Sequence, residues 1–324
     1  MRHGVARYQR RCSRPPPTLG GTGLWRSSPR RLPRRLSRRH SWIVRLAPLT
    51  ARCASVGAVP SLDVNGLLAS LSLPSLSLPS LSRMDPRFRV DLIAATPNPQ
   101  QCVYAAMHQD YSEGFVAADR DEWPDEQRAG EICVKRLLAG ERGHYGPLEH
   151  AQIVLNVGWF PHSVMQQART HRVGVSFDVQ SMRYTGDRIR KAANGELELD
   201  EVFYLRPVGS YSDRQGKKYA YDEAQRAIDL QLCRMAAERY RDLLDAGYAE
   251  EHARGILPFD YRQHFIVSFS LRALLHFLDL RAKLDAQQEI RALCDLLWPH
   301  LQAWTPQFAD WYEKSRLHRA RLAP

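Results

Sequence analysis

The stretch Ala151-Gln-Ile-Val-Leu-Asn-Val-Gly-Trp159, which leads through Pro161-His-Ser163 to Arg169, decides the fold of this chain. Residues 151–159 alternate and are rich in β-branched side chains, a pattern that predicts a half-buried strand. Pro161 and Ser163 are typical of a helix start, and we expect Ser163 to cap a helix that runs to Arg169. A strand that passes directly into a helix indicates mixed α and β structure.

The elements expected on both sides of this stretch follow no βαβ order. The sequence predicts strands at 89–95 and 202–205, helices at 100–108, 125–138, 221–244 and 272–297, and a short helix around 253–254. Residues 264–267 fit either a strand or the start of a helix. The helix at 221–244 is amphipathic by its apolar period, which is carried by Ile228, Leu232, Met235 and Leu243. We therefore expect an α+β fold, with mixed helices around a small sheet, rather than a doubly wound one.

An arginine-rich stretch follows the helix that ends at Arg169. It reads Arg169-Thr-His171-Arg172-Val-Gly-Val-Ser176-Phe-Asp178-Val-Gln180-Ser181-Met-Arg183-Tyr184. Guanidinium groups this close repel one another, so an anion should compensate them. A phosphate ester fits best, because each planar guanidinium binds two phosphate oxygens while hydroxyl groups fill the remaining lone pairs. The alternative is a solvated basic loop, as most charge clusters are.

The net charge of +11 is distributed unevenly along the chain. Residues 1–83 hold 15 Arg, no Lys and a single acid, Asp63, whereas residues 84–324 hold 31 Lys and Arg against 34 Asp and Glu. Residues 84–324 are therefore slightly acidic, which speaks against a general nucleic-acid-binding surface.

We divide the chain into a leader, residues 1–83, and one folded domain, residues 84–324. The leader is Arg-rich at 31–39 and repeats short Ser-Leu-Pro units at 70–82, so we expect it to be disordered. Three interpretations stay open: an organelle targeting peptide, a nucleic-acid-binding arm, or upstream sequence that is absent from the native protein because translation starts at Met84. The abrupt change of composition at Met84 favours the last.

The six cysteines form no Cys-x-x-Cys pair, so the sequence indicates neither a zinc site nor a redox dithiol. No apolar run is long enough to span a membrane. We expect a cytoplasmic protein that binds neither metal nor membrane. Since no Gly-x-Gly-x-x-Gly or P-loop occurs, a dinucleotide would be held by side chains and loops of another fold.

Three further polar clusters lie outside the arginine-rich stretch. Residues 143–150 read Gly-His-Tyr-Gly-Pro-Leu-Glu-His, and Pro147 argues against helical His-x-x-x-His metal ligation there. Residues 253–258 read Ala-Arg-Gly-Ile-Leu-Pro. Residues 276–287 belong to the expected helix 272–297, whose core face is formed by Leu274, Leu275, Leu278 and Ala282. His276 and Arg281 lie off that face, and a surface ion pair of Arg281 with Asp285 is the simplest role for this arginine.

Together the four clusters resemble the flavin-dependent thymidylate synthases. The signature of that family is Arg-His-Arg, seven residues and Ser, usually followed by one residue and Arg-Tyr. Its supporting motifs are His-x-x-Pro-(aromatic or Leu)-Glu-His, Ala-Arg-x-x-Leu-Pro, and a late helix with Leu-Arg-Ala and Ala-Gln. All occur here in this order, over about residues 86–315. The similarity is greatest to cyanobacterial members, which begin near Met-Asp-Pro-Arg-Phe-Arg, as residues 84–89 do.

The resemblance implies a largely antiparallel sheet within the α+β fold, and an enzyme that makes dTMP from dUMP. The one-carbon donor would be 5,10-methylenetetrahydrofolate, and FAD reduced by NADPH would be the reductant. Members of the family are homotetramers with active sites at subunit interfaces, so the same is expected here. None of the cysteines has the Pro-Cys-His context of the cysteine-dependent thymidylate synthase.

The resemblance also implies roles for individual residues. Two are expected in catalysis: Arg281, which would hydrogen-bond the uracil carbonyl and stabilise developing charge, and His144, which would position substrate or move a proton. The residues expected to bind dUMP are Gln166, Arg169, Gln180, Ser181, Arg183, Arg281 and, from a neighbouring subunit, Arg254. The residues expected to bind FAD are Glu149, His171, Arg172, Ser176, Asp178 and His276.

The sequence departs from the family pattern at several positions. Thr170 splits Arg-His-Arg, and eight residues rather than seven separate Arg172 from Ser181. Val179 stands where an acidic residue is usual, so Asp178 or Gln180 would take that contact. The other departures are Gly146 for a flavin-contacting Ser or Thr, His276 for an Asn and Asp285 for a His. We expect these changes to affect individual flavin contacts more than the activity.

Two other functions stay open on the sequence. The clusters also fit a non-catalytic nucleotide- or RNA-binding protein that uses the Arg-rich leader as an arm. A flavin- and folate-dependent methyltransferase acting on RNA is the other candidate, although the net charge of −3 in residues 84–324 argues against a tRNA-binding surface. Ser181 as a nucleophile is disfavoured, because no base for its hydroxyl is evident.

Overall fold

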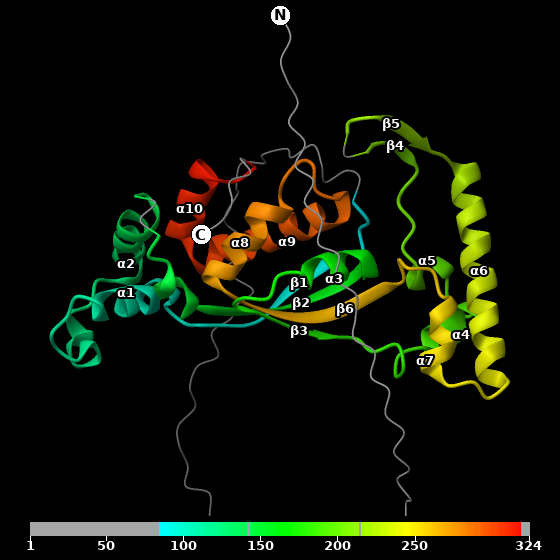
Figure 1. Cartoon of the computed structure of the whole chain (residues 1–324), viewed down its shortest axis with the longest axis horizontal. Coiled ribbons are helices and arrows are strands. Elements are labelled where there is room, and N and C mark those ends of the chain that lie inside the picture. Colours follow the sequence, from blue (N-terminus) through cyan, green and yellow to red (C-terminus); the bar gives the residue numbers. More distant parts are fainter. Residues whose placement is uncertain (1–83, 141–142, 214, 319–324) are drawn as a thin grey trace, which may run out of the picture. The chain divides into compact units, whose positions relative to one another are not determined.

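The structure, a computed structural model, describes residues 84–140, 143–213 and 215–318 (Figure 1). The expectations for the leader, residues 1–83, therefore lie outside the described residues. Every element below belongs to the unit Pro74–Pro324. In this unit no described helix is long and apolar enough to cross a membrane.

A four-stranded antiparallel sheet positions the residues of interest. Its strand order is β1 (Arg89–Ala95), β2 (Gln152–Pro161), β6 (Arg262–Ser270) and β3 (Val175–Val179). The sheet confirms the predicted α+β class and the strands expected at 89–95 and 151–159. It also settles residues 264–267 as part of a strand, β6. The arginine-rich stretch supplies the edge strand β3.

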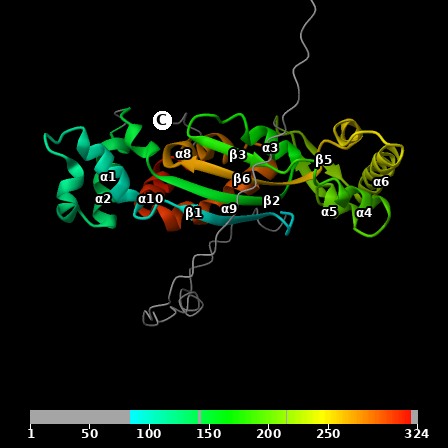
Figure 2. The ribbon, with the colours of Figure 1, turned by 90° about the horizontal axis from the view of Figure 1, so that it is seen from below.

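Helices cover one face of this sheet. The helices α3 (His162–Ala168), α8 (Leu271–Arg281) and α9 (Gln288–Trp304) pack on it, and α10 (Pro306–Ser315) packs on α9. The alternate residues of β2 and β6 that face the helices, such as Leu155 and Phe265, are buried in the main core with Leu274 and Leu278. In Figure 2 none of the described helices covers the other face of the sheet. That open face carries exposed residues, among them Ile266 at 40% exposure.

Two helical groups flank the sheet in sequence. The first holds α1 (Pro99–Gln109), a 3₁₀ turn at Val116–Glu122, α2 (Glu126–Cys133) with its π-helical extension Val134–Leu138, and a 3₁₀ turn at Gly146–Glu149. The second holds α4 (Asp187–Ala193), α5 (Leu199–Val202), the hairpin of β4 (Gly209–Ser212) and β5 (Lys218–Tyr221), α6 (Glu223–Asp245), α7 (Glu250–Ala253) and a 3₁₀ turn at Arg254–Ile256. The second group has its own small core around Ile189, Val202 and Tyr240.

Two local predictions were wrong because tertiary contacts replaced the expected local ones. Ser163 does not cap α3; the helix starts at His162, and the Ser163 amide donates to the Asp260 carboxylate at 3.1 Å. The strand expected at 202–205 is not formed. Val202 ends α5, where its side chain is buried, and only Phe203 forms an isolated bridge to Tyr261.

The long helix predicted at 272–297 is two helices. The helix α8 ends at Arg281 and α9 begins at Gln288, so the chain turns at residues 282–287. The break lets both helices pack on the same core, while Leu284 in the turn is 77% exposed. The predicted core face of α8, including Leu274 and Leu278, is confirmed. The turn places Arg281 at the free end of a helix.

The helix α6 is confirmed, but of its predicted apolar stripe Leu243 alone packs against a core of the described chain. Ile228, Leu232 and Met235 are each more than half exposed. The face that packs on the rest of the group carries Cys233, Ala237 and Tyr240 instead. Tyr240 is fully buried in this second core, and Leu230, Leu243 and Leu244 of the same helix pack against it.

Candidate active site

The turn between α3 and β3 brings the first half of the arginine-rich stretch into a fixed shape. Arg169 ends α3, and the amides of Thr170 and His171 donate to the last carbonyls of that helix. Gly174 has a φ of +66°, which favours glycine. A Cβ at this position would also collide with the Ser270 hydroxyl and the Glu149 carboxylate. The turn therefore holds these groups close to the backbone of β3.

Arg281 is held by two groups of this turn and by one carbonyl of the last turn of α3. Its Nε donates to His171 Nε2 at 3.1 Å, and its Nη2 donates to the Gln167 carbonyl at 3.1 Å and to Thr170 Oγ1 at 2.8 Å. The expected ion pair with Asp285 does not form among the described residues. The reason is the break after α8, which ends the helical spacing that would join the two side chains.

His171 is buried and neutral. Burial first, then the charges of Arg281 and His276, lower its pKa from 6.5 to about 4. Since Nε2 accepts a hydrogen bond from Arg281, the proton must sit on Nδ1. The ring of His276 lies 5.3 Å from that of His171, and its buried Nδ1 has no partner among the described residues. His171, His276 and Arg281 thus form one group.

Glu149 joins a second group that the sequence did not suggest. Its carboxylate accepts from the Ser270 hydroxyl at 2.6 Å and from Arg272 Nη1 at 3.3 Å. Ser270 also caps α8 by accepting from the Ala273 amide. A serine before a helix is a recognisable cap signal, but only the fold shows that it faces Glu149. Ser270 and Arg272 are therefore additions to the candidate site.

Gln166 belongs to a third group beside the sheet. Its Nε2 lies 2.6 Å from Nε2 of His162, whose Nδ1 lies 2.6 Å from Gln263 Oε1. The His162 ring stacks on Tyr261 at 4.8 Å. Burial raises the pKa of Tyr261, and the nearby positive charges of Arg254 and Arg188 oppose this rise. Gln166 and Arg254 therefore approach the same aromatic ring system from different elements.

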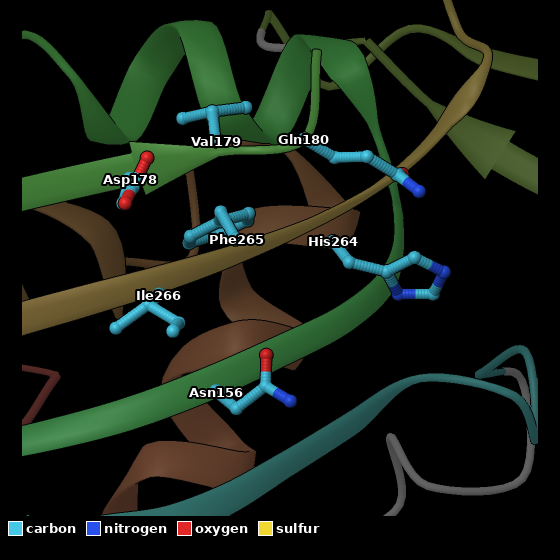
Figure 3. Close-up of a pocket in the computed structure, with 7 residues that line it drawn as sticks. All are labelled: Asn156, Asp178, Val179, Gln180, His264, Phe265 and Ile266. Carbon is cyan, nitrogen blue, oxygen red and sulfur yellow. The ribbon is translucent and has the colours of Figure 1, made fainter. Parts of the chain in front are cut away.

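The open face of the sheet carries Asp178 and Gln180. Cross-strand register aligns Asn156, Ile266 and Asp178 in one row, and Figure 3 shows this row beside Gln180 and His264. These residues line a hollow of about 260 Å³. The buried Gln180 Oε1 has no partner among the described residues. Burial and the charge of Arg188 lower the pKa of His264. Ser176 is exposed on β3, directly opposite Ser268.

Four predicted arginines have no acidic partner in the described part of the chain. The side chains of Arg169, Arg172 and Arg254 are exposed and make no hydrogen bond or ion pair there. Arg183 stacks on the Tyr184 ring at 5.5 Å and is otherwise unpaired. Ser181 precedes Arg183 at a turn, where its carbonyl accepts from Tyr184 and Thr185.

His144 lies in a separate contact. Its Nε2 is 2.7 Å from Oδ2 of Asp110, and both side chains are about half exposed. No described contact joins this pair to Arg281, Arg183 or Arg254. One chain thus brings the predicted residues into several groups rather than one pocket. No group of three or more His, Cys, Asp and Glu among the described residues is arranged to hold a metal ion.

This chain is similar in sequence to the proteins of one known family. The model of the family "Thymidylate synthase complementing protein" matches residues 91–307. The "Flavin-dependent thymidylate synthase" of Haloarcula marismortui is 32% identical over 246 residues, which cover 72% of this chain and 99% of the relative. The protein of the same name from Halobacterium salinarum is 32% identical over 250 residues, 73% of this chain and 100% of the relative.

Two solved structures share the fold. A UMP/dUMP methylase, PolB from Streptomyces cacaoi, bound with 5-Br dUMP, matches with a TM-score of 0.57 and 22% identity, covering 75% of this chain and 99% of its own. Thymidylate synthase X from Helicobacter pylori, with FAD and dUMP, matches with a TM-score of 0.52 and 19% identity, covering 68% of this chain and 96% of its own.

Proposed function

The chain belongs to the flavin-dependent thymidylate synthases, and we propose that it methylates dUMP to dTMP with 5,10-methylenetetrahydrofolate, FAD and NADPH. The observation that carries the proposal is the arginine-rich stretch, whose Arg169, Arg172 and Arg183 have no acidic partner among the described residues. Guanidinium groups that the chain leaves unpaired are suited to an anionic ligand. Both a nucleotide phosphate and the two phosphates of FAD meet that requirement.

For dUMP, we propose that Arg169, Ser181 and Arg183 bind the phosphate. Gln166 and Gln180 would contact the nucleoside, and the unpartnered Gln180 Oε1 offers an acceptor for an N–H donor. Arg281 would donate to the uracil carbonyl, because one side of its guanidinium is already fixed by His171 and Thr170. A fixed donor stabilises the negative charge that develops on that oxygen when the ring is attacked.

For FAD, the residues present fit the group. Among the described residues, the exposed Arg172 guanidinium and the buried His276 Nδ1 both lack a partner. We propose that these residues hold FAD with Glu149, His171, Ser176, Asp178 and, from the fold, Arg272. Bound FAD, reduced by NADPH, supplies the reducing equivalents of the methylation. The neutral His171 would keep one side of this site free of extra positive charge.

His144 would position substrate or move a proton. The imidazole is half exposed and reaches only the Asp110 carboxylate within the described chain. That carboxylate selects the ring nitrogen that carries a proton, which leaves the other nitrogen for a substrate or a water.

We propose that the protein acts as a homotetramer with active sites shared between subunits. The exposed apolar stripe of Ile228, Leu232 and Met235 on α6 and the open face of the sheet support this assembly, since each leaves apolar area to be covered. Light scattering should give a mass about four times 37.1 kDa.

A cytoplasmic location and an absent leader stay proposals. The described cysteines, Cys102, Cys133, Cys233 and Cys294, are free thiols, which suits a reducing compartment. The non-catalytic nucleic-acid-binding alternative is not favoured, because the curated relatives are named as enzymes and residues 84–324 carry no excess of positive charge.

Incubation of the purified chain with dUMP, methylenetetrahydrofolate, FAD and NADPH tests the proposal. We expect dTMP, measured by chromatography, and a flavin absorbance band that stays with the protein after gel filtration. Omission of FAD from a flavin-stripped sample should abolish the product. A colourless protein that makes no dTMP under any of these conditions would contradict the proposal.

A further inference from the structure

We infer that Thr170, the residue that splits the Arg-His-Arg signature, is a positioning residue for Arg281. The inference deepens the proposed function and rests on it. Thr170 Oγ1 accepts a hydrogen bond from Arg281 Nη2 at 2.8 Å, although the two residues are 111 positions apart in the chain. The extra residue in the signature therefore makes a specific contact with the arginine proposed to bind uracil.

The contacts of Arg281 leave some of its N–H donors available to a substrate. A guanidinium has five N–H donors in a fixed plane. In Arg281 the Nε hydrogen goes to His171, and the Nη2 hydrogens go to the Gln167 carbonyl and Thr170. The described residues offer no partner to Nη1. The three contacts fix the plane of the group and leave one nitrogen, with two donors, to face a substrate.

The hydroxyl of Thr170 both donates and accepts a hydrogen bond at this position. It donates to the Gln167 carbonyl at 2.7 Å and accepts from Arg281, so its single hydrogen and one lone pair are both used. The Gln167 carbonyl belongs to the last turn of α3, where helix carbonyls have no partner within the regular helix and carry partial negative charge that attracts cations. Thr170 thus joins the end of α3 to the last residue of α8. A β-branched side chain holds its hydroxyl in few rotamers.

A purely structural role for Thr170 would consist of ending α3 through its bond to Gln167. The two roles differ in their dependence on Arg281. If Thr170 acts through the arginine, its removal has no effect once Arg281 is replaced. If it only ends the helix, its removal has the same effect in either background.

The experiment is a double-mutant cycle on the FAD-loaded enzyme. The variants are Thr170→Val, which keeps the shape without the hydroxyl, Thr170→Ser, Arg281→Gln, and Thr170→Val with Arg281→Gln. Both kcat/KM by tritium release from labelled dUMP and the dissociation constant of dUMP, from the change in flavin absorbance, are measured. Thr96→Val is the matched control, because Thr96 accepts a hydrogen bond from the Gln152 amide and lies outside the proposed site.

We expect Thr170→Val to lower kcat/KM about tenfold, as befits one hydrogen bond to a charged group. Thr170→Ser should restore activity to within about threefold, and Thr96→Val should leave it unchanged. In the Arg281→Gln background, Thr170→Val should change both kcat/KM and the dUMP dissociation constant by less than about twofold. Thr170 is exposed, so the variants should fold; bound FAD and the melting temperature check this, and Thr170→Ala is the second variant.

Two outcomes would overturn the inference alone. One is that the wild-type enzyme makes dTMP and that Thr170→Val and Thr170→Ala have the same kcat/KM as the wild type. The other is an equal loss of dUMP affinity with and without Arg281. A wild-type protein that makes no dTMP would overturn the proposed function and this inference with it.

Discussion

Two sets of arginines in this protein differ in whether a carboxylate of the described chain pairs with them. Arg262 on β6 is 1% exposed, pairs with the Asp85 carboxylate, and donates to the carbonyls of Asp200 at 2.6 Å and Trp159 at 2.8 Å. Arg169 and Arg183 are exposed and meet no carboxylate in the described chain. An arginine whose counter-charge lies in its own chain stabilises the fold, whereas an unpaired one is available to a ligand.

Removal of one arginine from each set should affect stability very differently. Arg262→Met should destabilise the protein by about 3–5 kcal/mol, because the buried Asp85 carboxylate loses its buried cation and keeps the Arg87 amide, at 3.0 Å, and the Arg87 guanidinium, at 3.7 Å. Arg183→Met should change stability by no more than about 0.5 kcal/mol, as surface substitutions do. Urea unfolding followed by circular dichroism measures both. Equal losses of stability would remove the distinction between the two sets.

Arg281 belongs to neither set. It is partly buried, and its partners among the described residues are neutral groups. Arg281→Ala should lower dTMP formation by about 10²- to 10³-fold, the usual effect of losing one donor to a developing negative charge. Bound FAD should stay close to the wild-type amount. Tritium release and flavin absorbance measure the two quantities. Turnover near that of the wild type would show that Arg281 has no part in the reaction.

The stability of the protein should depend on pH through His171, which is neutral beside Arg281. Its pKa is about 4 in the folded state and about 6.5 when unfolded. Above pH 6.5 both states are neutral; as the pH falls, the unfolded state binds the proton first, so stability is lost between about pH 6.5 and 4. At pH 5 the loss from this group should be about 2 kcal/mol. His171→Asn should show a correspondingly smaller loss between pH 7 and 5, and an unchanged pH dependence would contradict the assignment.

The smallest effect concerns the start of the domain. A chain that begins at Met84 should keep full activity and stability, since Asp85 and its contact with Arg262 remain. A chain that begins at Phe88 lacks Asp85 and Arg87, so it should lose stability to the same degree as Arg262→Met. Activity assays and urea unfolding on both chains test this. A folded but inactive chain from Met84 would show that the leader has a role.

Local sequence patterns predicted the strands β1 and β2, the helix α6 and the core face of α8, because each depends on a period within one element. They missed the break after Arg281, since the apolar period of 272–297 continues through it. They also did not predict that most of the apolar stripe of α6 is exposed in this chain. The period of a helix shows that it has an apolar face, but not which neighbour covers that face. Such outcomes depend on contacts between distant elements.

The candidate site was predictable to the level of motifs. The resemblance pointed to Arg281 and His171, and the fold then joined them directly. The partners Thr170, Ser270 and Arg272 were not predictable, because their contacts join positions more than 100 residues apart. Thr170 looked like a departure from the signature, and only the end of α8 explains it.

We propose that arginines without an acidic partner in the described chain bind the phosphate of dUMP. Calorimetric titration with dUMP and with deoxyuridine is the most direct test of this proposal. Arg183→Gln should weaken dUMP binding about tenfold or more and leave deoxyuridine binding unchanged. Arg190→Gln is the matched control, because Arg190 already pairs with Asp245 at 2.8 Å, and it should bind both ligands as the wild type does. Equal weakening of dUMP and deoxyuridine in Arg183→Gln, or no weakening at all, would contradict the claim.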